Sequence, residues 1–328
     1  MARSHLDRRR FVGHGAVAML GLASGRTAWA APEFPTRPIR IIIPFAAGGN
    51  ADIIMRIVAD KLSGRLPQRV IVENRVGGGG IVAAEAVRSS PADGHTLFVL
   101  AVGTAISVAL FKSLPFDPIK DFSPISSVSK FDMLLLVKAD SPIRTVADFL
   151  AEARRRGEAM NIGTTLPGSS QYLAGALLKS TADITATVIP FRTSPDVLTA
   201  LLRGDIAMGI ESYSALGAAI DAGQIRPIAS SGTARTLANV PTARESGLPK
   251  FEVVGWNALF APAGTPDDVI AFLNQEIRDV VALPDFRKRV TELGGIPDSS
   301  TPAELADLLA KDIAKWRAVV DEAGIERK

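Results

Sequence analysis

The first candidate site is a loop of small residues that joins an apolar run to a helical pattern. It reads Pro44-Phe45-Ala46-Ala47-Gly48-Gly49-Asn50-Ala51-Asp52. Small side chains let a bound molecule approach the backbone closely, and the start of the following helix offers unpaired N–H groups at the positive end of its dipole. Such a loop favours an anion, a carboxylate or a phosphate, without an arginine. Asp52 has two interpretations, a helix-capping residue or, in addition, a group that positions a water or a ligand amine.

A second loop repeats this device at residues 163–170 and adds the hydroxyl groups of Thr164, Thr165, Ser169 and Ser170. Its glycine spacing is that of a phosphate-binding loop, but Ser169 stands where such a loop needs lysine, so an ATP site is not expected. If the two loops face each other across a cleft, they would hold a small molecule with two acceptor ends. The alternative is that both are only tight turns between a strand and a helix.

Residue types that most enzymes need are scarce. Residues 31–328 contain one histidine, His95, and the whole chain contains no cysteine. Thiol nucleophiles, cysteine-ligated metals and disulfide frameworks are therefore excluded, and the chain has neither a Gly-x-Ser-x-Gly elbow nor a His-Glu-x-x-His pair. His95 stands in Asp93-Gly94-His95-Thr96, which is typical of a turn before a strand. The sequence favours a binding protein over an enzyme, with no catalytic residue, metal or cofactor expected.

The composition is that of a globular protein whose charge is unevenly distributed. Apolar residues make up 47% and charged residues 22% of the 328 residues, which excludes a disordered or fibrous protein. Residues 1–30 carry five arginines and one aspartate, whereas residues 31–328 carry 32 basic and 33 acidic side chains. The body of the chain therefore has no basic excess that would indicate a nucleic-acid partner.

Residues 1–30 have the order of a secretory signal peptide. Arg8-Arg9-Arg10 is followed by an uncharged stretch over residues 11–25 and then by Ala28-Trp29-Ala30, after which cleavage is expected. The stretch is too short and too weakly apolar to span a bilayer. Arg-Arg-x-Phe also fits a twin-arginine signal, and the sequence leaves general secretion and twin-arginine export open. Either route predicts export, in a bacterium to the periplasm.

The elements that must position the two loops alternate between strands and helices, so the sequence predicts an α/β fold with mostly parallel sheets. An echo of strand, glycine-bearing loop and helix at residues 39–66 and 160–179 suggests two similar lobes, and from residue 265 the pattern is helical alone. The strand candidates are residues 39–44, 70–73, 96–102, 133–138, 160–163, 187–191, 206–210 and 225–230. The helix candidates between them are residues 52–66, 146–155, 170–179 and 196–202.

The chain resembles a known family, the Bug-type extracytoplasmic receptors of tripartite tricarboxylate transporters. The order and spacing of the motifs along the mature chain are highly specific. The segments that carry the resemblance are Arg37-Pro38-Ile39-Arg40-Ile41-Ile42-Ile43-Pro44-Phe45, Gly48-Gly49 with Asp52, Val72-Glu73-Asn74-Arg75 with the glycines that follow, Asp93-Gly94-His95-Thr96-Leu97, Leu114-Pro115-Phe116-Asp117-Pro118, Gly168-Ser169 with Tyr172-Leu173-Ala174-Gly175, Val240-Pro241-Thr242, Glu245 with Gly247-Leu248-Pro249, Ala261-Pro262-Ala263-Gly264-Thr265-Pro266, Lys315-Trp316 and Ala323-Gly324-Ile325.

The resemblance implies a two-lobed periplasmic-binding-protein fold of type II, a Venus flytrap. Lobe one would comprise residues 31–136 and 256–328, with a C-terminal helical segment packed on it, and lobe two residues 137–255. It further implies a monomeric receptor that captures an organic acid or a related amide and delivers it to the membrane subunits of the transporter. Two alternatives stay open: a ligand-sensing module for a signalling partner, and a cleft hydrolase with Ser169 as nucleophile and Asp52 or Glu211 as base.

The resemblance also implies which residues hold the ligand carboxylate, through backbone amides, hydroxyl groups and bridging waters. The chain departs from the family pattern at Ala47, Val76, Tyr172, the stretch Phe191-Arg192-Thr193 and Glu211, and the last three departures affect selectivity. The ligand-binding residues so implied are Phe45, Ala46, Ala47, Gly48 and Asp52 in the first loop, Thr164, Thr165, Gly168, Ser169 and Ser170 in the second, and Phe191 and Glu211 near the far end of the ligand.

Overall fold

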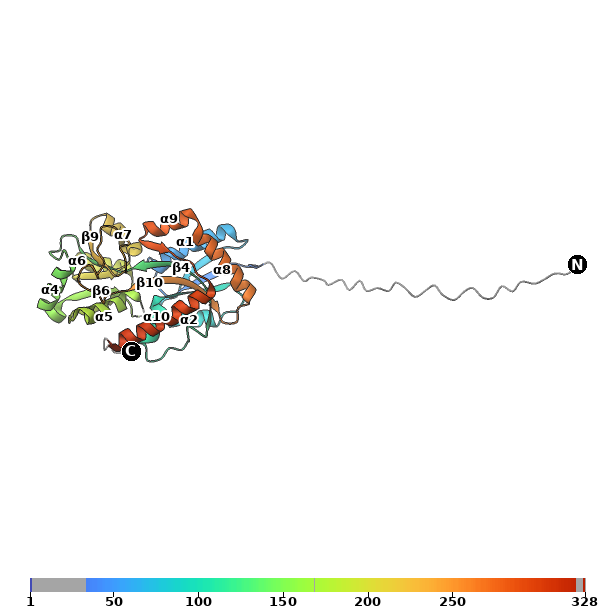
Figure 1. The fold of residues 1–328 in the computed structure, drawn as a ribbon, viewed down its shortest axis with the longest axis horizontal. Coiled ribbons are helices and arrows are strands. Elements are labelled where there is room, and N and C mark those ends of the chain that lie inside the picture. The colour runs from blue at the N-terminus through green and yellow to red at the C-terminus, as the bar shows by residue number, and fades with distance from the viewer. Residues whose placement is uncertain (2–33, 168, 323–326, 328) are drawn as a thin grey trace. The chain divides into compact units, whose positions relative to one another are not determined.

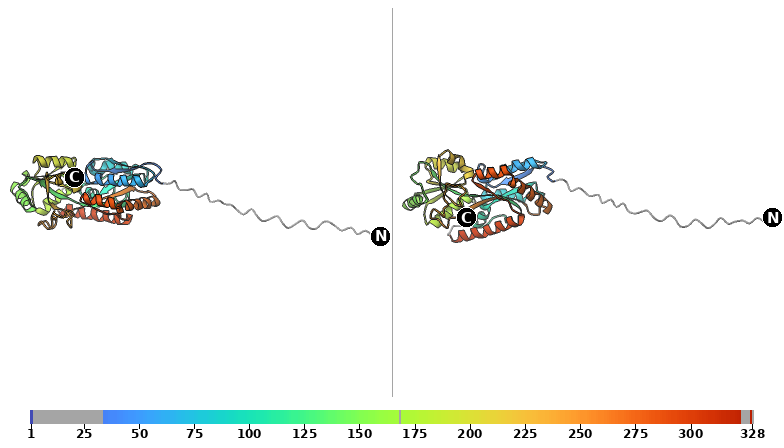
Figure 2. Two further views of the ribbon diagram at one scale, coloured as in Figure 1. Left: turned by 90° about the horizontal axis from the view of Figure 1, so that it is seen from above. Right: turned by 45° about the horizontal axis from the view of Figure 1, so that its top comes forward.

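The computed structural model describes Met1, residues 34–167, residues 169–322 and Arg327. Apart from Met1, the predicted signal peptide (residues 1–30) lies outside the described residues, as does one predicted site residue, Gly168. The described chain from Phe34 onward contains two β-sheets, each covered by helices (Figures 1 and 2). The predicted α/β class is therefore confirmed.

The larger sheet has six strands in the order β11-β4-β10-β3-β1-β2. Helices α1, α8 and α9 pack on one face of it, and α2, α3 and α10 lie on the other. Its strands are β1 (Ile39–Ile43), β2 (Val70–Asn74), β3 (Thr96–Ala101), β4 (Phe122–Asp132), β10 (Val254–Pro262) and β11 (Gly295–Pro297). Its helices are α1 (Asn50–Arg65), the short 3₁₀ turn η1 (Gly78–Gly80), α2 (Ile81–Arg88), α3 (Val102–Leu110), α8 (Asp267–Ala282), α9 (Pro284–Glu292) and α10 (Pro302–Glu322).

The smaller sheet has five strands in the order β7-β6-β8-β5-β9. Helices α6 and α7 cover one face, and α4 and α5 cover the other. Its strands are β5 (Leu134–Lys138), β6 (Asn161–Thr165), β7 (Thr187–Phe191), β8 (Met208–Glu211) and β9 (Ile225–Ser230). Its helices are α4 (Val146–Arg156), the 3₁₀ turn η2 (Gly157–Ala159), α5 (Ser170–Ala182), α6 (Ser194–Arg203) and α7 (Tyr213–Asp221).

The central strands are buried on both faces, which explains why they read as unbroken apolar runs. In β1, Ile41 and Ile43 pack with α1 and α8, whereas Ile42 faces the opposite core with Phe98 and Leu100 of β3. Alternate side chains of a strand point to opposite faces, so both faces must be apolar when helices cover both. The two sheets share one of these cores, because the cluster that contains Ile42 continues into the smaller sheet.

Two sequence predictions about the strands are wrong. The sheets are mixed, because β10 runs antiparallel to β3 and β4, and β5 runs antiparallel to β8 and β9. The chain passes between the sheets through β4 and β5, which are separated by Met133 alone, and returns through β10. A strand that arrives without a helical crossover is not restricted to the parallel direction. The C-terminal part is also not helical alone, since the short strand β11 follows α9.

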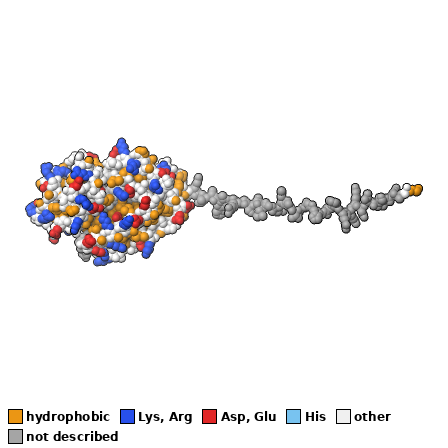
Figure 3. All heavy atoms as spheres, viewed as in Figure 1, with side chains coloured by type: hydrophobic (Ala, Val, Ile, Leu, Met, Phe, Trp, Pro, Cys, Tyr) orange, Lys and Arg blue, Asp and Glu red, His pale blue; other side chains and the backbone are white. Residues whose placement is uncertain are grey.

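Other details refine the predicted elements. The C-terminal helix α10 packs on α3 and β4 of the larger sheet, as the resemblance implied. His95 is buried in the turn before β3, where its Nε2 atom accepts a hydrogen bond from the Thr36 N–H at 3.1 Å. It is a structural turn residue, as the sequence predicted. Acidic and basic side chains are interspersed over the face drawn in Figure 3, in keeping with the balanced charge of residues 31–328.

Candidate functional site

The candidate site is a pocket of about 800 Å³, its mouth included, between loops that follow strands of both sheets. The larger sheet contributes the loop after β1 and the glycine run before α2, and the smaller sheet contributes the loops after β6 and β7. These loops lie close together, since a Cβ atom at Gly49 would be 3.9 Å from the Ser194 Oγ atom. The lining residues are Pro44, Phe45, Ala46, Gly49, Asn50, Ala51, Val76, Gly77, Gly78, Gly79, Gly80, Ala101, Gly103, Phe131, Thr165, Leu166, Pro167, Ser169, Ser170, Gln171, Arg192, Thr193, Ser194 and Asn257.

The helices that begin at this pocket include α1, α5 and α6, in addition to α3, whose capping residue Ala101 also lines it. The lining includes the first two residues of α1, Asn50 and Ala51, the first two of α5, Ser170 and Gln171, and the first of α6, Ser194. Among the described residues, no acceptor receives a hydrogen bond from the backbone N–H of any of these five. Free N–H groups and the positive ends of three helix dipoles therefore surround one cavity, an arrangement that attracts an anion.

The start of α5 is fixed by its capping residue, Ser169. The Ser169 Oγ atom accepts a hydrogen bond from the Tyr172 N–H at 3.1 Å and another from the Thr165 Oγ1 atom at 2.9 Å. A serine at this position satisfies one of the N–H groups that the first helical turn leaves unpaired. Of the N–H groups in the first turn of α5, the Ser169 side chain accepts only that of Tyr172. The N–H groups of Ser170 and Gln171 therefore stay available to the pocket.

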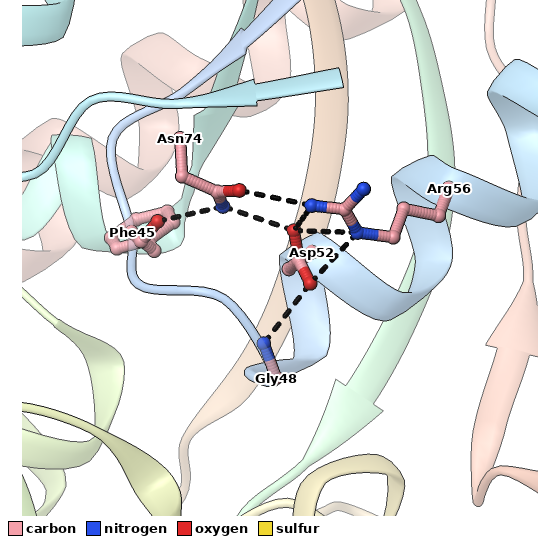
Figure 4. Close-up of polar contacts among 5 residues, drawn as sticks. All are labelled: Phe45, Gly48, Asp52, Arg56 and Asn74. Carbon is pink, nitrogen blue, oxygen red and sulfur yellow. Dashed lines mark hydrogen bonds and ion pairs between the residues drawn. The ribbon is translucent and has the colours of Figure 1, made fainter. Parts of the chain in front are cut away.

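The loop after β1 is held from behind by Asp52 (Figure 4). The carboxylate accepts from the Gly48 N–H at 3.0 Å, from Asn74 Nδ2 at 3.0 Å and from Arg56 Nε at 3.1 Å. Asn74 also donates to the Phe45 carbonyl at 3.0 Å, so both ends of the loop are tied to one cluster. Burial works against the ionised carboxylate, but the hydrogen bonds from Arg56, Gly48 and Asn74 outweigh it and lower the pKa of Asp52.

A second carboxyl group, that of Glu211, lies fully buried behind the opposite wall. It accepts hydrogen bonds from Gln171 Nε2 at 3.0 Å, Ser194 Oγ at 2.9 Å and the Ser212 N–H at 2.8 Å. Burial raises the pKa of Glu211, and these hydrogen bonds, all from uncharged donors, only partly oppose the shift. Since Gln171 and Ser194 line the pocket, Glu211 sets the orientation of two lining side chains without lining the pocket itself.

A chain of buried polar side chains connects Glu211 to the larger sheet. Ser212 Oγ lies 3.3 Å from the Glu211 carboxylate and 3.0 Å from Ser214 Oγ. Asn50 Nδ2 donates to Ser214 Oγ at 2.6 Å, and Asn257 Nδ2 donates to Asn50 Oδ1 at 2.6 Å. Because Ser214 lies in the first turn of α7 on the smaller sheet and Asn50 begins α1 on the larger, the Asn50–Ser214 bond links the two halves beside the pocket.

The structure brings some of the predicted site residues to the pocket and leaves others behind it. Ala47 is exposed outside the lining, and Gly48 and Asp52 bond to each other behind the first loop. Thr164 is buried, with its hydroxyl bonded to the Thr165 carbonyl. Phe191 ends β7 just before the lining residue Arg192. The predicted residues that do line the pocket are Phe45, Ala46, Thr165, Ser169 and Ser170.

Sequence reasoning did not select several lining residues. Ser194 lies one residue and Gln171 two residues after a capping residue. This local signal was available in the sequence, since residues of the first helical turn present free N–H groups. Asn50 belonged to the first loop but was not singled out. Asn257 lies on β10, which no sequence pattern indicated, and Arg192 follows a predicted strand but was noted only as a departure from the family.

The described residues contain no group of three or more His, Cys, Asp or Glu side chains placed to hold a metal ion. None of the helices in the described part of the chain combines the length and the apolar character that a membrane span requires.

Two helix-covered sheets with a pocket between their loops are the arrangement of a solute-binding protein. The model of the "Tripartite tricarboxylate transporter family receptor" matches residues 54–325. The chain therefore belongs to this family of solute-binding receptors, and the resemblance seen in the sequence is confirmed.

The relatives are similar over nearly the whole chain. A protein encoded in the tcbD–tcbE intergenic region of Pseudomonas sp. strain P51 is 33% identical, over 97% of this chain and 95% of the relative. Protein BugT of Bordetella pertussis is 29% identical, over 95% of this chain and 98% of the relative. These similarities agree with the Bug type that the sequence motifs indicated.

Solved structures agree with the fold as well. Rpa4515 of R. palustris, determined with adipate, is 30% identical with a TM-score of 0.86 and aligns over 90% of this chain and 99% of its own. MatC (Rpa3494) of Rhodopseudomonas palustris, with bound malate, is 32% identical with a TM-score of 0.82, over 88% of this chain and 100% of its own. The two-lobed periplasmic-binding-protein architecture is therefore confirmed.

Proposed function

We propose that this protein is a periplasmic receptor that binds a small organic acid in the pocket and delivers it to a membrane carrier. Residues 1–30 serve as the export signal and are removed. The receptor acts as a monomer and performs no reaction on its ligand. The adipate and malate held by Rpa4515 and MatC are organic acids, which supports this ligand class.

The observation that carries the proposal is the meeting of three helix N-termini at one cavity. Five free N–H groups surround the cavity, and no acidic side chain lines it in the described part of the chain. A carboxylate placed there receives charge-assisted hydrogen bonds, which are stronger than bonds between neutral groups. Backbone donors also suit a receptor, because they bind an anion without a lysine or arginine at that end of the ligand.

Within this proposal the predicted site residues divide into two roles. Phe45, Ala46, Thr165, Ser169 and Ser170 contact the ligand, together with the free N–H groups of the three helices. Gly168, between two of these residues in sequence, completes the second loop. The remaining residues support the pocket from behind and are Ala47, Gly48, Asp52, Thr164, Phe191 and Glu211.

We further propose that the two halves move as lobes, residues 31–136 with 256–328 as lobe one and residues 137–255 as lobe two. The ligand lies between loops of both lobes, so it stabilises the closed arrangement that the carrier recognises. The Asn50–Ser214 hydrogen bond is one of the contacts that closure would form.

A hydrolase in the same cleft has less support. Ser169 Oγ is engaged by Thr165 and by the Tyr172 N–H, as a helix cap requires. Asp52 is tied to Arg56, and Glu211 lies fully buried behind Gln171 and Ser194. A nucleophile needs a base within hydrogen-bond reach, and among the described residues neither Asp52 nor Glu211 forms a hydrogen bond with Ser169.

A thermal-shift screen tests the receptor function. The purified protein is unfolded and refolded to remove any copurified ligand, and is then heated with mono-, di- and tricarboxylates, aromatic acids, amino acids and amides. A ligand at about 100 times its Kd adds about 2.7 kcal/mol to the free energy of unfolding, a rise of about 4 °C in Tm for a chain of this size. A rise confined to carboxylates supports the proposal. Refolded protein that responds to no acid would contradict it.

The role of the helix N-termini is tested by a pair of variants at Ser170, the first residue of α5. Proline is tolerated at this helical position and removes the N–H group. Ser170→Ala removes only the hydroxyl and serves as the control. We expect Ser170→Pro to bind the acid about 10-fold more weakly than Ser170→Ala, since a hydrogen bond to a charged group contributes about 1.5–3 kcal/mol. Equal affinities of the two folded variants would remove this N–H from the site.

A further inference from the structure

We propose that Arg192 is the specificity-determining residue of this pocket and pairs with a second anionic group on the ligand, so that the preferred ligand is a dicarboxylate. This inference rests on the proposed receptor function. It concerns the end of the ligand that the helix N-termini do not hold.

Arg192 is placed at the pocket by the order of strands in the smaller sheet. It directly follows β7, which pairs in parallel with β6, and Phe191 at the end of β7 lies opposite Thr165 at the end of β6. The carboxyl ends of adjacent parallel strands meet at one edge of a sheet. The loop that contains Arg192 therefore lies beside the loop that contains Ser169, and both line the pocket.

The backbone beside Arg192 is anchored. Thr193 Oγ1 accepts from the Asp196 N–H at 3.2 Å, and the Thr193 N–H donates to the Asp196 carboxylate at 3.1 Å. This reciprocal capping box fixes the start of α6. It also engages Asp196, the acidic residue nearest to Arg192 in sequence, in a bond to the backbone.

The charge of Arg192 is unopposed. It is the one charged side chain among the described residues that line the pocket. No carboxylate in the described part of the chain forms an ion pair or hydrogen bond with it, although many of the exposed arginines there are paired, Arg155 and Arg235 among them. An arginine side chain stays charged and presents a fork of donors that matches a carboxylate.

The two kinds of donor have different consequences for ligand choice. Backbone N–H groups hold one carboxylate of any organic acid, and so do not distinguish a monocarboxylate from a dicarboxylate. An arginine that lines the same cavity and has no ion-pair partner among the described residues adds binding energy only for a ligand with a second negative group. A ligand of this class places one carboxylate at the helix N-termini and the other at Arg192.

The test compares each dicarboxylate with its own monoamide, which has the same length and shape and lacks one charge. Affinities of succinate, glutarate and adipate and of their monoamides are measured by calorimetry at low and at physiological salt. The proteins are wild type, Arg192→Gln, Arg192→Lys and the control Arg203→Gln. Arg203 is an exposed arginine at the end of α6 and does not line the pocket.

We expect the wild type and Arg203→Gln to bind the best dicarboxylate at least 10-fold more tightly than its monoamide, with a preference that falls as salt rises. Arg192→Gln loses this preference and keeps its affinity for the monoamide, and Arg192→Lys keeps part of it. A preference that persists in Arg192→Gln, or a wild type that binds both ligands equally, overturns the role of Arg192 and leaves the receptor function standing. A folded wild type that binds none of the six compounds overturns the dicarboxylate preference, and the wider thermal-shift panel then decides separately whether the receptor function stands.

Discussion

Two carboxyl groups support the pocket from opposite sides, and their pKa values are shifted in opposite directions. Asp52, behind the first loop, faces the half-exposed guanidinium of Arg56, and its pKa is lowered. Glu211, behind the second wall, is fully buried among uncharged donors, and its pKa is raised. The two pKa values shift in opposite directions because only Asp52 has a cationic partner, the half-exposed Arg56, whereas Glu211 has none.

This difference in pKa shift indicates that the two carboxyl groups support different parts of the pocket: Asp52 the loop after β1, and Glu211 the opposite wall, which contains Gln171 and Ser194. The cluster around Asp52 ties the Phe45 carbonyl and the Gly48 N–H to α1, so it fixes the backbone of the first loop. Glu211 holds the side chains of Gln171 and Ser194, which line the pocket, so its charge state affects what the pocket presents to a ligand. The first loop is therefore tied by a carboxylate whose pKa is lowered, whereas the side chains opposite it are held by a carboxyl group whose pKa is raised.

The largest effect is expected from Asp52→Ala, which removes the acceptor shared by Gly48, Asn74 and Arg56. Leaving these donors without it costs about 3 kcal/mol of the free energy of unfolding, measured by urea denaturation at pH 7. Because the folded pKa lies below the ordinary value of 3.8, the stabilisation is present above pH 3.8 and is lost as the pH falls through the folded pKa. The difference in the free energy of unfolding between the wild type and Asp52→Ala therefore decreases in acid.

A matched control for this variant is Asp60→Ala, since Asp60 is an exposed aspartate on the same helix. Its removal is expected to change the free energy of unfolding by less than about 0.5 kcal/mol. If Asp52→Ala were no more destabilising than Asp60→Ala, the first loop would not depend on this cluster.

An intermediate effect, visible in the pH dependence, is expected from Glu211→Gln. With a folded pKa raised above 4.5, the native wild type keeps a proton that the unfolded chain releases. Its free energy of unfolding therefore falls as the pH rises from 4.5 to the folded pKa, by about 1.4 kcal/mol for each unit between the two values. Glutamine does not titrate, so the variant gains stability relative to wild type over this range.

Denaturation of both proteins between pH 4 and pH 8 measures that difference. Asp132 and Asp312, whose pKa values burial also raises, are present in both proteins, so the difference between the two curves isolates Glu211. Two parallel curves would mean that Glu211 does not titrate differently in the folded and unfolded chains, and the contrast with Asp52 would disappear.

The smallest effect is expected from Ser214→Ala, which interrupts the polar chain between the two walls. The variant removes the acceptor of the Asn50 side chain, and with it a hydrogen bond that joins the two halves. Because ligand binding favours the closed arrangement, we expect the affinity to fall about fivefold, equivalent to about 1 kcal/mol. Calorimetry with the acid identified by the thermal screen measures the affinity. Thr181→Ala, which removes a hydroxyl bonded within α5, serves as the control. Wild-type affinity in Ser214→Ala would show that the two walls act independently.

Local patterns in the sequence were sufficient for much of the fold. The apolar runs that became β1, β3, β6 and β9 are short and largely buried. The helices after β1 and β6 begin at Gly49, which permits a tight turn, and at Ser169, which caps the helix. Both loops at the pocket were found in this way, because a glycine-rich or hydroxyl-rich start to a helix is a property of a few adjacent residues. The buried turn role of His95 followed from the same kind of local signal.

The direction of the strands and the composition of the pocket were not local properties. β10 pairs with β3 and β4, which are more than 100 residues away, and it brings Asn257 to the pocket from a segment with no strand signal. Asp52 points away from the pocket because Asn74, on a neighbouring strand, and Arg56 bind it there.

The sequence by itself thus determined the α/β class, the two anion-favouring loops and the family. Helix starts, turns and apolar periodicity are encoded within a few residues and need no partner. The tertiary structure alone decided that Arg192, Gln171, Ser194 and Asn257 share one cavity with those loops, and that Asp52 and Glu211 stand behind it. Those relations depend on which distant strands pair and which helices pack together, and contacts of that kind are set by the burial of the whole core and not by any short segment.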